Sequence, residues 1–102
     1  MKLSIGDRIN ILQILPKKGS YLKLVVIEDL QKKIGITQDE IVKHNIITKD
    51  NEITWQIEKE INEFDFKKLE IIEIESALIE LSKANELTAD TFNLYKLFEI
   101  KE

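Results

Sequence analysis

Cysteine is absent from this sequence, and histidine occurs only once. Without thiols the chain can hold neither a disulfide framework nor a thiolate metal site, and such a composition suits a reducing cytoplasm. No apolar run approaches the roughly 20 residues that a membrane-spanning helix needs. Asp7 and Arg8 interrupt the apolar stretch at the N-terminus, so the sequence predicts no signal peptide. We therefore expect a cytosolic protein that does not associate with a membrane.

Glycine and proline are scarce as well, with three copies and one copy. None of the glycines has the spacing of a phosphate-binding loop, so the sequence predicts no nucleotide cofactor. The rest is an ordinary globular mixture, 43% hydrophobic and 33% charged. The length is that of one domain, and no repeat or linker divides it. We expect a single domain over residues 1–102.

Charge is distributed unevenly along the chain. The net charge is −4, but residues 1–44 alone carry +3 and residues 45–102 carry −7. We interpret the two halves as two solvated faces of one domain.

Capping signals predict the first and third helices. Ser4 is a suitable N-cap, with Asp7 three residues on, and Pro16 ends the helix that follows. Thr37 and Glu40 form a capping box, in which each side chain accepts a hydrogen bond from a backbone N–H of the other residue. This is the strongest local signal in the chain, and it starts a short helix.

The segment between these helices has two interpretations. Its apolar residues Leu22, Val26, Leu30 and Ile34 recur at helical spacing. Gly35 stands where a helix commonly ends in a left-handed residue. Leu24 to Ile27 is instead an apolar run rich in β-branched residues, which also fits a strand. The length of the segment favours the helix.

A hairpin is predicted next. A two-residue turn at Asp50 and Asn51 places Lys49 opposite Glu52, and Ile46 opposite Trp55. One face of this hairpin is expected to carry Ile46, Thr48, Ile53 and Trp55 and to close a core. The alternation of EFDF predicts a third strand over Glu63–Phe66.

Two further helices complete the prediction. A long helix from about residue 67 to residue 85 has a main apolar stripe and a second stripe of Ile72 and Ile79, so we expect burial on more than one side. Thr88 caps the last helix, whose inward face we expect to consist of Leu94, Tyr95, Leu97 and Phe98. The fold class is therefore α+β, a small antiparallel sheet packed against four or five helices.

Several segments resemble a known group of proteins. The opening LSIGDRINILQILPKKGSYLKL, the hairpin Trp55, the EFDF strand and the closing LTADTFNLYKLF are similar to small phage and prophage proteins of unassigned function. The resemblance covers most of the chain as a loose pattern without a functional motif. It implies a bacterial host cytoplasm and transfers no catalytic or binding residue.

Enzymatic chemistry has few candidate residues. His44 is a lone histidine at a helix end, whereas catalysis or metal binding requires further groups placed around it. Glu70, Glu73 and Glu75 follow the acidic run Glu58–Phe66 and are typical of a solvated face, although such carboxylates also suit acid–base work or Mg²⁺. All four phenylalanines fall on apolar stripes, which predicts core positions rather than a stacking surface for nucleic acid. We expect no catalytic, cofactor or metal site.

Helix, turn, short helix and hairpin is also the order of a winged-helix DNA-binding domain. In that alternative Lys32, Lys33 and Lys43 would face phosphates. The helix that would read DNA begins Gln38-Asp39-Glu40, however, and the two carboxylates there oppose phosphate binding. DNA binding is therefore the second hypothesis.

The leading hypothesis is a non-enzymatic module that binds another protein or itself. It depends on the lack of a chemical constellation and on the surplus of apolar positions in the long helix. If the chain self-associates, a two-fold homodimer is the default arrangement. We expect the last two helices to carry the contact, through Leu78, Ile79, Tyr95 and Phe98.

Overall fold

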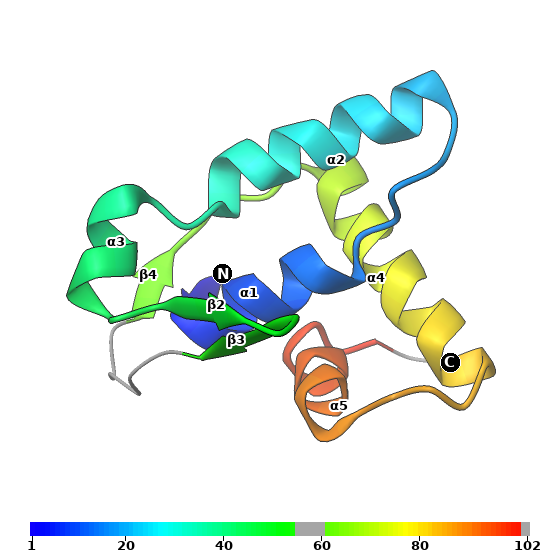
Figure 1. The fold of residues 1–102 in the computed structure, drawn as a ribbon. Coiled ribbons are helices and arrows are strands. Elements are labelled where there is room, and N and C mark those ends of the chain that lie inside the picture. The colour runs from blue at the N-terminus through cyan, green and yellow to red at the C-terminus, as the bar shows by residue number, and fades with distance from the viewer. Residues whose placement is uncertain (55–60, 101–102) are drawn as a thin grey trace.

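The computed structural model describes residues 1–54 and 61–100 and has the predicted α+β class. Two antiparallel sheets of two strands each accompany the helices in this part of the chain (Figure 1). The elements are β1 (Lys2–Ser4), α1 (Ile5–Ile14), α2 (Tyr21–Ile34), α3 (Gln38–Lys43), β2 (Ile47–Lys49), β3 (Glu52–Thr54), β4 (Ile61–Glu63), α4 (Lys68–Lys83) and α5 (Ala89–Leu97).

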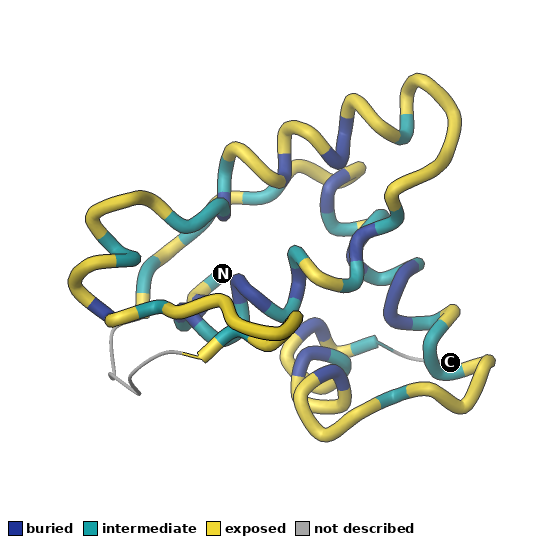
Figure 2. Tube along the Cα trace, in the orientation of Figure 1, coloured by how far each residue is buried: buried dark blue, intermediate teal, exposed yellow. Residues whose placement is uncertain are grey.

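Helix α1 is the centre of the molecule. It packs against α2, α4 and α5, while β1 leads directly into it. The buried residues accordingly lie on the sides of the helices that face α1, and the outer turns are exposed (Figure 2). The core consists of Leu3, Ile11, Leu15, Ile27, Leu30, Ile34, Ile74, Leu78, Leu94 and Phe98.

Local signals in the sequence placed the helix starts correctly. Ser4 Oγ accepts from Asp7 N–H at 3.1 Å, and Ser4 N–H donates to the Asp7 carboxylate at 3.1 Å. Thr37 and Glu40 form the predicted capping box of α3, with distances of 3.0 and 3.2 Å. Residues 21–34 are helical throughout, which confirms the helical interpretation of that segment.

The expected left-handed conformation of Gly35 is wrong. Its φ is −56° and its ψ is 145°, which any residue can adopt. Glycine is needed here for space, because a Cβ on Gly35 would lie 2.4 Å from the carbonyl oxygen of Gln31.

The hairpin has the predicted register. Lys49 pairs with Glu52, and the turn residues Asp50 and Asn51 have φ values of 52° and 64°. Two positive φ values in a two-residue loop identify a type I′ turn, whose twist suits a hairpin. Trp55, and with it the predicted pairing to Ile46, lies outside the described residues.

The third strand is displaced from its predicted position. It covers Ile61–Glu63 rather than Glu63–Phe66, and it pairs with β1 instead of the hairpin. The N-terminal strand β1 was not predicted, since a three-residue strand has no pattern of its own. Phe64 and Phe66 follow the strand and pack, half-buried, against the core.

Helices α4 and α5 match the prediction except on their outer sides. Ile74 and Leu78 are fully buried, but Ile72 of the second stripe is 43% exposed. The inward position expected for Phe92 and Leu97 is also wrong, because both are exposed. The Phe92 ring lies outside the core, with Lys96 Nζ 4.6 Å from its centroid.

Candidate binding surfaces

Arg8 joins three helices from a buried position that the sequence analysis missed. It is only 3% exposed. Its Nε donates to Ile34 O at 3.0 Å, and Nη2 donates to Gly35 O at 2.7 Å. These are carbonyls at the end of α2, which have no partner within their own helix. Arg8 therefore caps α2 from α1.

The same guanidinium binds Glu40, the capping-box residue of α3. Nη1 lies 2.5 Å from Oε2, and Nη2 lies 2.9 Å from Oε1. Hydrogen bonding from Arg8 lowers the pKa of Glu40 to about 2, against the opposing effect of burial and with help from the N–H of Thr37. The Arg8 guanidinium also lies 5.1 Å from the ring centroid of Phe64. Most of the five N–H donors of Arg8 are thus used in contacts that hold the fold together.

Lys33 and Glu70 form a second clamp, between α2 and α4. Lys33 Nζ lies 2.5 Å from Glu70 Oε1, which also accepts from Lys67 N–H at 2.7 Å. Burial raises the pKa of Glu70, but these hydrogen bonds outweigh it and lower the pKa overall. Lys33 Nζ is also 5.7 Å from the Phe66 ring centroid.

The other acidic candidates do not converge. Glu73 forms an ion pair with Lys23 of α2 at 3.8 Å. Across residues 1–54 and 61–100, no three His, Asp or Glu side chains gather closely enough to hold a metal ion. His44 is almost fully buried at the end of α3, where its backbone N–H donates to Glu40 O at 2.9 Å.

The three lysines of the DNA-binding alternative have different surroundings. Lys33 is bound to Glu70, and Lys32 is paired with Glu28 at 3.1 Å on the same helix. Lys43 is exposed in the last turn of α3, a helix of six residues. The positive charges of Lys32 and Lys33 are therefore neutralised by neighbouring carboxylates.

The four predicted contact residues divide into two groups. Leu78 and Phe98 belong to the core, with 0% and 7% exposure. They cannot meet a partner while the fold is intact, because the strongest apolar stripes of α4 and α5 face the chain's own core. Ile79 and Tyr95 are half-buried and keep some accessible surface.

A different apolar surface is exposed where α2 and α4 pack together. We call it the α2–α4 face, and it is formed by Tyr21, Leu22, Val25, Leu69 and Ile72, which are 39% to 87% exposed. A shallow hollow of about 310 Å³ lies between the helices and is lined by Leu22, Val25 and Leu69. Asp29, Lys67 and Lys68 also line it, so charges of both signs lie beside the apolar residues.

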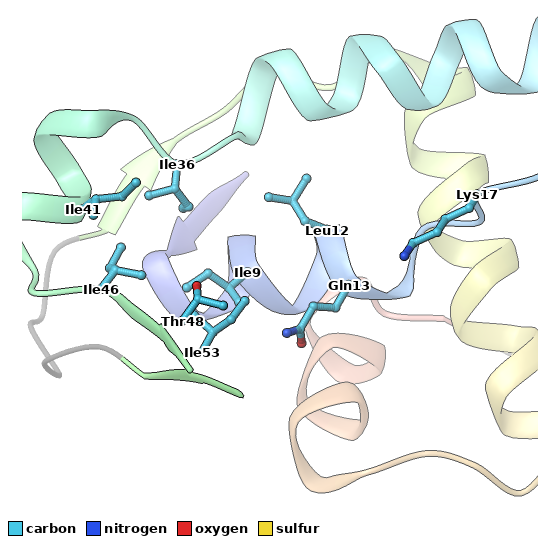
Figure 3. Close-up of a pocket in the computed structure, with 9 residues that line it drawn as sticks. All are labelled: Ile9, Leu12, Gln13, Lys17, Ile36, Ile41, Ile46, Thr48 and Ile53. Atoms are coloured by element: carbon cyan, nitrogen blue, oxygen red, sulfur yellow. The ribbon is translucent and has the colours of Figure 1, made fainter. Parts of the chain in front are cut away.

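A second hollow is a groove on another side, between α1, α3 and the hairpin (Figure 3). Its volume is about 440 Å³. Isoleucines gather at one end, while Gln13 and Lys17 lie at the other (Figure 3). We call it the isoleucine groove, and its lining residues are Ile9, Leu12, Gln13, Lys17, Ile36, Ile41, Ile46, Thr48 and Ile53.

No protein-family model, curated protein or solved structure matches this chain. Among the described residues, no helix is long and apolar enough to cross a membrane.

Sequence signals for these sites did exist. Ile72 belongs to the second stripe of the long helix, and a second stripe on an amphipathic helix indicates either burial or a binding surface. Arg8 lies three residues after Ile5 and four before Leu12, so it is a charged residue within an apolar stripe. A charge in such a position indicates a buried ion pair.

Proposed function

We propose that this protein is a non-enzymatic protein–protein interaction module whose partner at the α2–α4 face is a second copy of itself. The proposal rests on one observation, the five large apolar side chains exposed on two adjacent helices. A contiguous apolar patch on a small soluble domain is typical of an interaction site. The cellular setting that we propose is that of the phage and prophage proteins that the sequence resembles.

Charge supports a second copy as the partner. Asp29 of α2 and Lys68 of α4 both line the hollow of this face. In a two-fold dimer the same surface meets itself, so a residue at one position contacts a different residue of the other copy. A rotation axis through the hollow would bring Asp29 of each copy towards Lys68 of the other. The apolar residues between them would be buried at the same time.

Light scattering over a range of protein concentrations tests the proposal. We expect a dimer that Leu69→Glu dissociates, because the substitution would bury a carboxylate in the contact. Val42→Glu is the matched control, since Val42 is 73% exposed on α3, away from this face. It should leave the mass unchanged. A monomer at every concentration would contradict self-association.

A charge exchange distinguishes self-association from binding to another protein. Asp29→Lys alone and Lys68→Asp alone should each weaken the dimer about tenfold, since each places like charges together. The double variant restores opposite charges in both copies and should recover most of the lost affinity. If the two effects simply add, Asp29 and Lys68 are not paired across the axis. That result would contradict the proposed geometry.

A further inference from the structure

The isoleucine groove borders a strand edge with unused backbone groups. In the hairpin Lys49 pairs with Glu52 beside the turn, and Thr48 pairs with Ile53. Hydrogen-bonded and non-hydrogen-bonded pairs alternate along an antiparallel ladder, and the pair beside a two-residue turn is hydrogen-bonded. Thr48 is therefore in a non-hydrogen-bonded pair, so its N–H and C=O point away from β3. Neither group has a backbone hydrogen bond to another described residue.

The groove supplies apolar surface beside this edge. Thr48 itself lines the groove, together with Ile46 of the hairpin segment and Ile9 of α1 (Figure 3). An added strand points every second side chain to the same face, so one set of alternate side chains would enter the groove. A volume of about 440 Å³ lies within the range of specific binding pockets and exceeds that of a single aliphatic side chain.

The polar end of the groove indicates the charge of its occupant. Lys17 lines this end and is exposed. It forms no ion pair with any other residue of the described part of the chain. Its side chain runs towards the groove beside Gln13 (Figure 3). A carboxylate on the occupant would complement this charge.

We propose that the isoleucine groove binds an extended polypeptide segment with alternating apolar side chains and a carboxylate. The segment adds a strand to the outer edge of β2, exchanging two hydrogen bonds with the backbone of Thr48. Its apolar side chains lie on Ile9, Ile46 and Ile53, and its carboxylate meets Lys17. Main-chain pairing supplies affinity in this mode of recognition, and side-chain pockets supply specificity. The site is separate from the α2–α4 face and does not depend on dimer formation.

The probe is a capped peptide of alternating valine and threonine that ends in aspartate. We expect it to shift the amide resonances of Thr48 and the methyl resonances of Ile9, Ile46 and Ile53 in the spectrum of the full chain. Decanoate, an apolar carboxylate without a peptide backbone, is the comparison ligand. If decanoate shifts these resonances and the peptide does not, the groove is a small-molecule pocket. That outcome would overturn the proposal.

Backbone methylation of the probe tests strand pairing directly. In an added strand, alternate N–H groups face the protein and the rest face solvent. Two peptides are N-methylated on alternate residues, the first peptide on one set of residues and the second peptide on the other set. Methylation of the set that faces the protein should abolish binding, and methylation of the set that faces solvent should leave binding nearly unchanged. Equal effects of methylating either set would exclude pairing with β2.

Two substitutions test the protein side. Lys17→Glu should weaken peptide binding about tenfold, whereas Lys18→Glu should have little effect because Lys18 is exposed outside the groove. Thr48→Pro removes the outward N–H, and Thr48→Ala keeps it, so only the proline variant should lose affinity. Lys17 is on the surface, so its substitution keeps the test valid even if the proline variant does not fold. Equal binding by the Lys17→Glu and Lys18→Glu variants would contradict the assigned carboxylate contact.

The dimer at the α2–α4 face and peptide binding in the isoleucine groove can be tested independently of each other. Groove variants should leave the mass in light scattering unchanged, and Leu69→Glu should leave peptide binding unchanged. Loss of both properties in one folded variant would show that the two sites are not independent.

Discussion

Arg8 and Glu40 lie 32 residues apart in the chain, yet two nitrogens of the guanidinium bind the two oxygens of the carboxylate. Arg8 simultaneously caps the carbonyls at the end of α2. One side chain thus fixes α1, the end of α2 and the start of α3 relative to each other. Two of these elements, α1 and α3, also line the isoleucine groove.

Removing this guanidinium should be costly. We expect Arg8→Ala to lower the free energy of unfolding by about 3–5 kcal/mol, because Glu40 loses its charged partner and two helix-end carbonyls lose their hydrogen-bond donors. Arg8→Lys should recover only part of the loss, since an ammonium lacks the planar fork. Urea denaturation followed by circular dichroism measures both. Lys32→Ala is the control, because its exposed pair with Glu28 should be worth less than about 1 kcal/mol. A loss below that value for Arg8→Ala would refute the clamp.

Stability should also fall in acid. The pKa of Glu40 is lowered from 4.5 to about 2 in the folded protein. Its contribution is therefore fully present above pH 4.5 and disappears as the pH falls towards 2. This lowering of the pKa corresponds to roughly 3 kcal/mol of folding stability at most, before screening of the partly exposed carboxyl is considered.

Glu40→Gln isolates this contribution from that of the other carboxyls. Glutamine can keep the capping interaction with Thr37 but does not titrate. The difference in unfolding free energy between the parent protein and Glu40→Gln should shrink as the pH falls from 4.5 to about 2, a window set by the ordinary and the lowered pKa. Parallel curves for the two proteins would mean that Arg8 does not hold Glu40 in its charged form. Glu70 should contribute in the same direction, because its pKa is also lowered.

Two glycines make a matched pair for a packing test. A Cβ on Gly35 would lie 2.4 Å from the backbone oxygen of Gln31, whereas a Cβ on Gly19 would meet only the side chain of Lys23. We expect Gly35→Ala to cost about 1–3 kcal/mol, since backbone must move. Gly19→Ala should be within about 0.5 kcal/mol of the parent, because the lysine side chain can turn away. Thermal unfolding compares the two, and equal melting temperatures would show that Gly35 is not required for space.

A core leucine and a surface leucine of α4 should respond differently. Leu78→Ala should cost about 2–5 kcal/mol at every protein concentration, because it opens a cavity in the core. Leu69→Ala should have little effect on the monomer, since Leu69 is 54% exposed. If the α2–α4 face forms a dimer, the effect of Leu69→Ala should appear only as the protein concentration rises. A large, concentration-independent cost for Leu69→Ala would place that residue in the monomer core instead.

Interactions between residues close in sequence were the most predictable. The capping boxes at Ser4 and Thr37 each join residues three apart, so a short window contains the whole interaction. The turn at Asp50 and Asn51 is likewise local, because both residues tolerate positive φ more readily than most. By contrast, the partner of β4 is β1, about 60 residues earlier in the chain, and no local pattern indicates that pairing.

The sequence by itself determined where the helices begin, how the hairpin turns and which stripes are apolar, since these depend on spacing along a few residues. Only the tertiary structure decided which stripe is covered. In the folded chain Leu78 is buried, and Leu69 and Ile72 are exposed. Arg8 is also buried and forms an ion pair with Glu40. The physical reason is that burial depends on which surfaces meet across the fold. A helix with two apolar stripes can bury one stripe in the core of its own chain and present the other stripe to a partner.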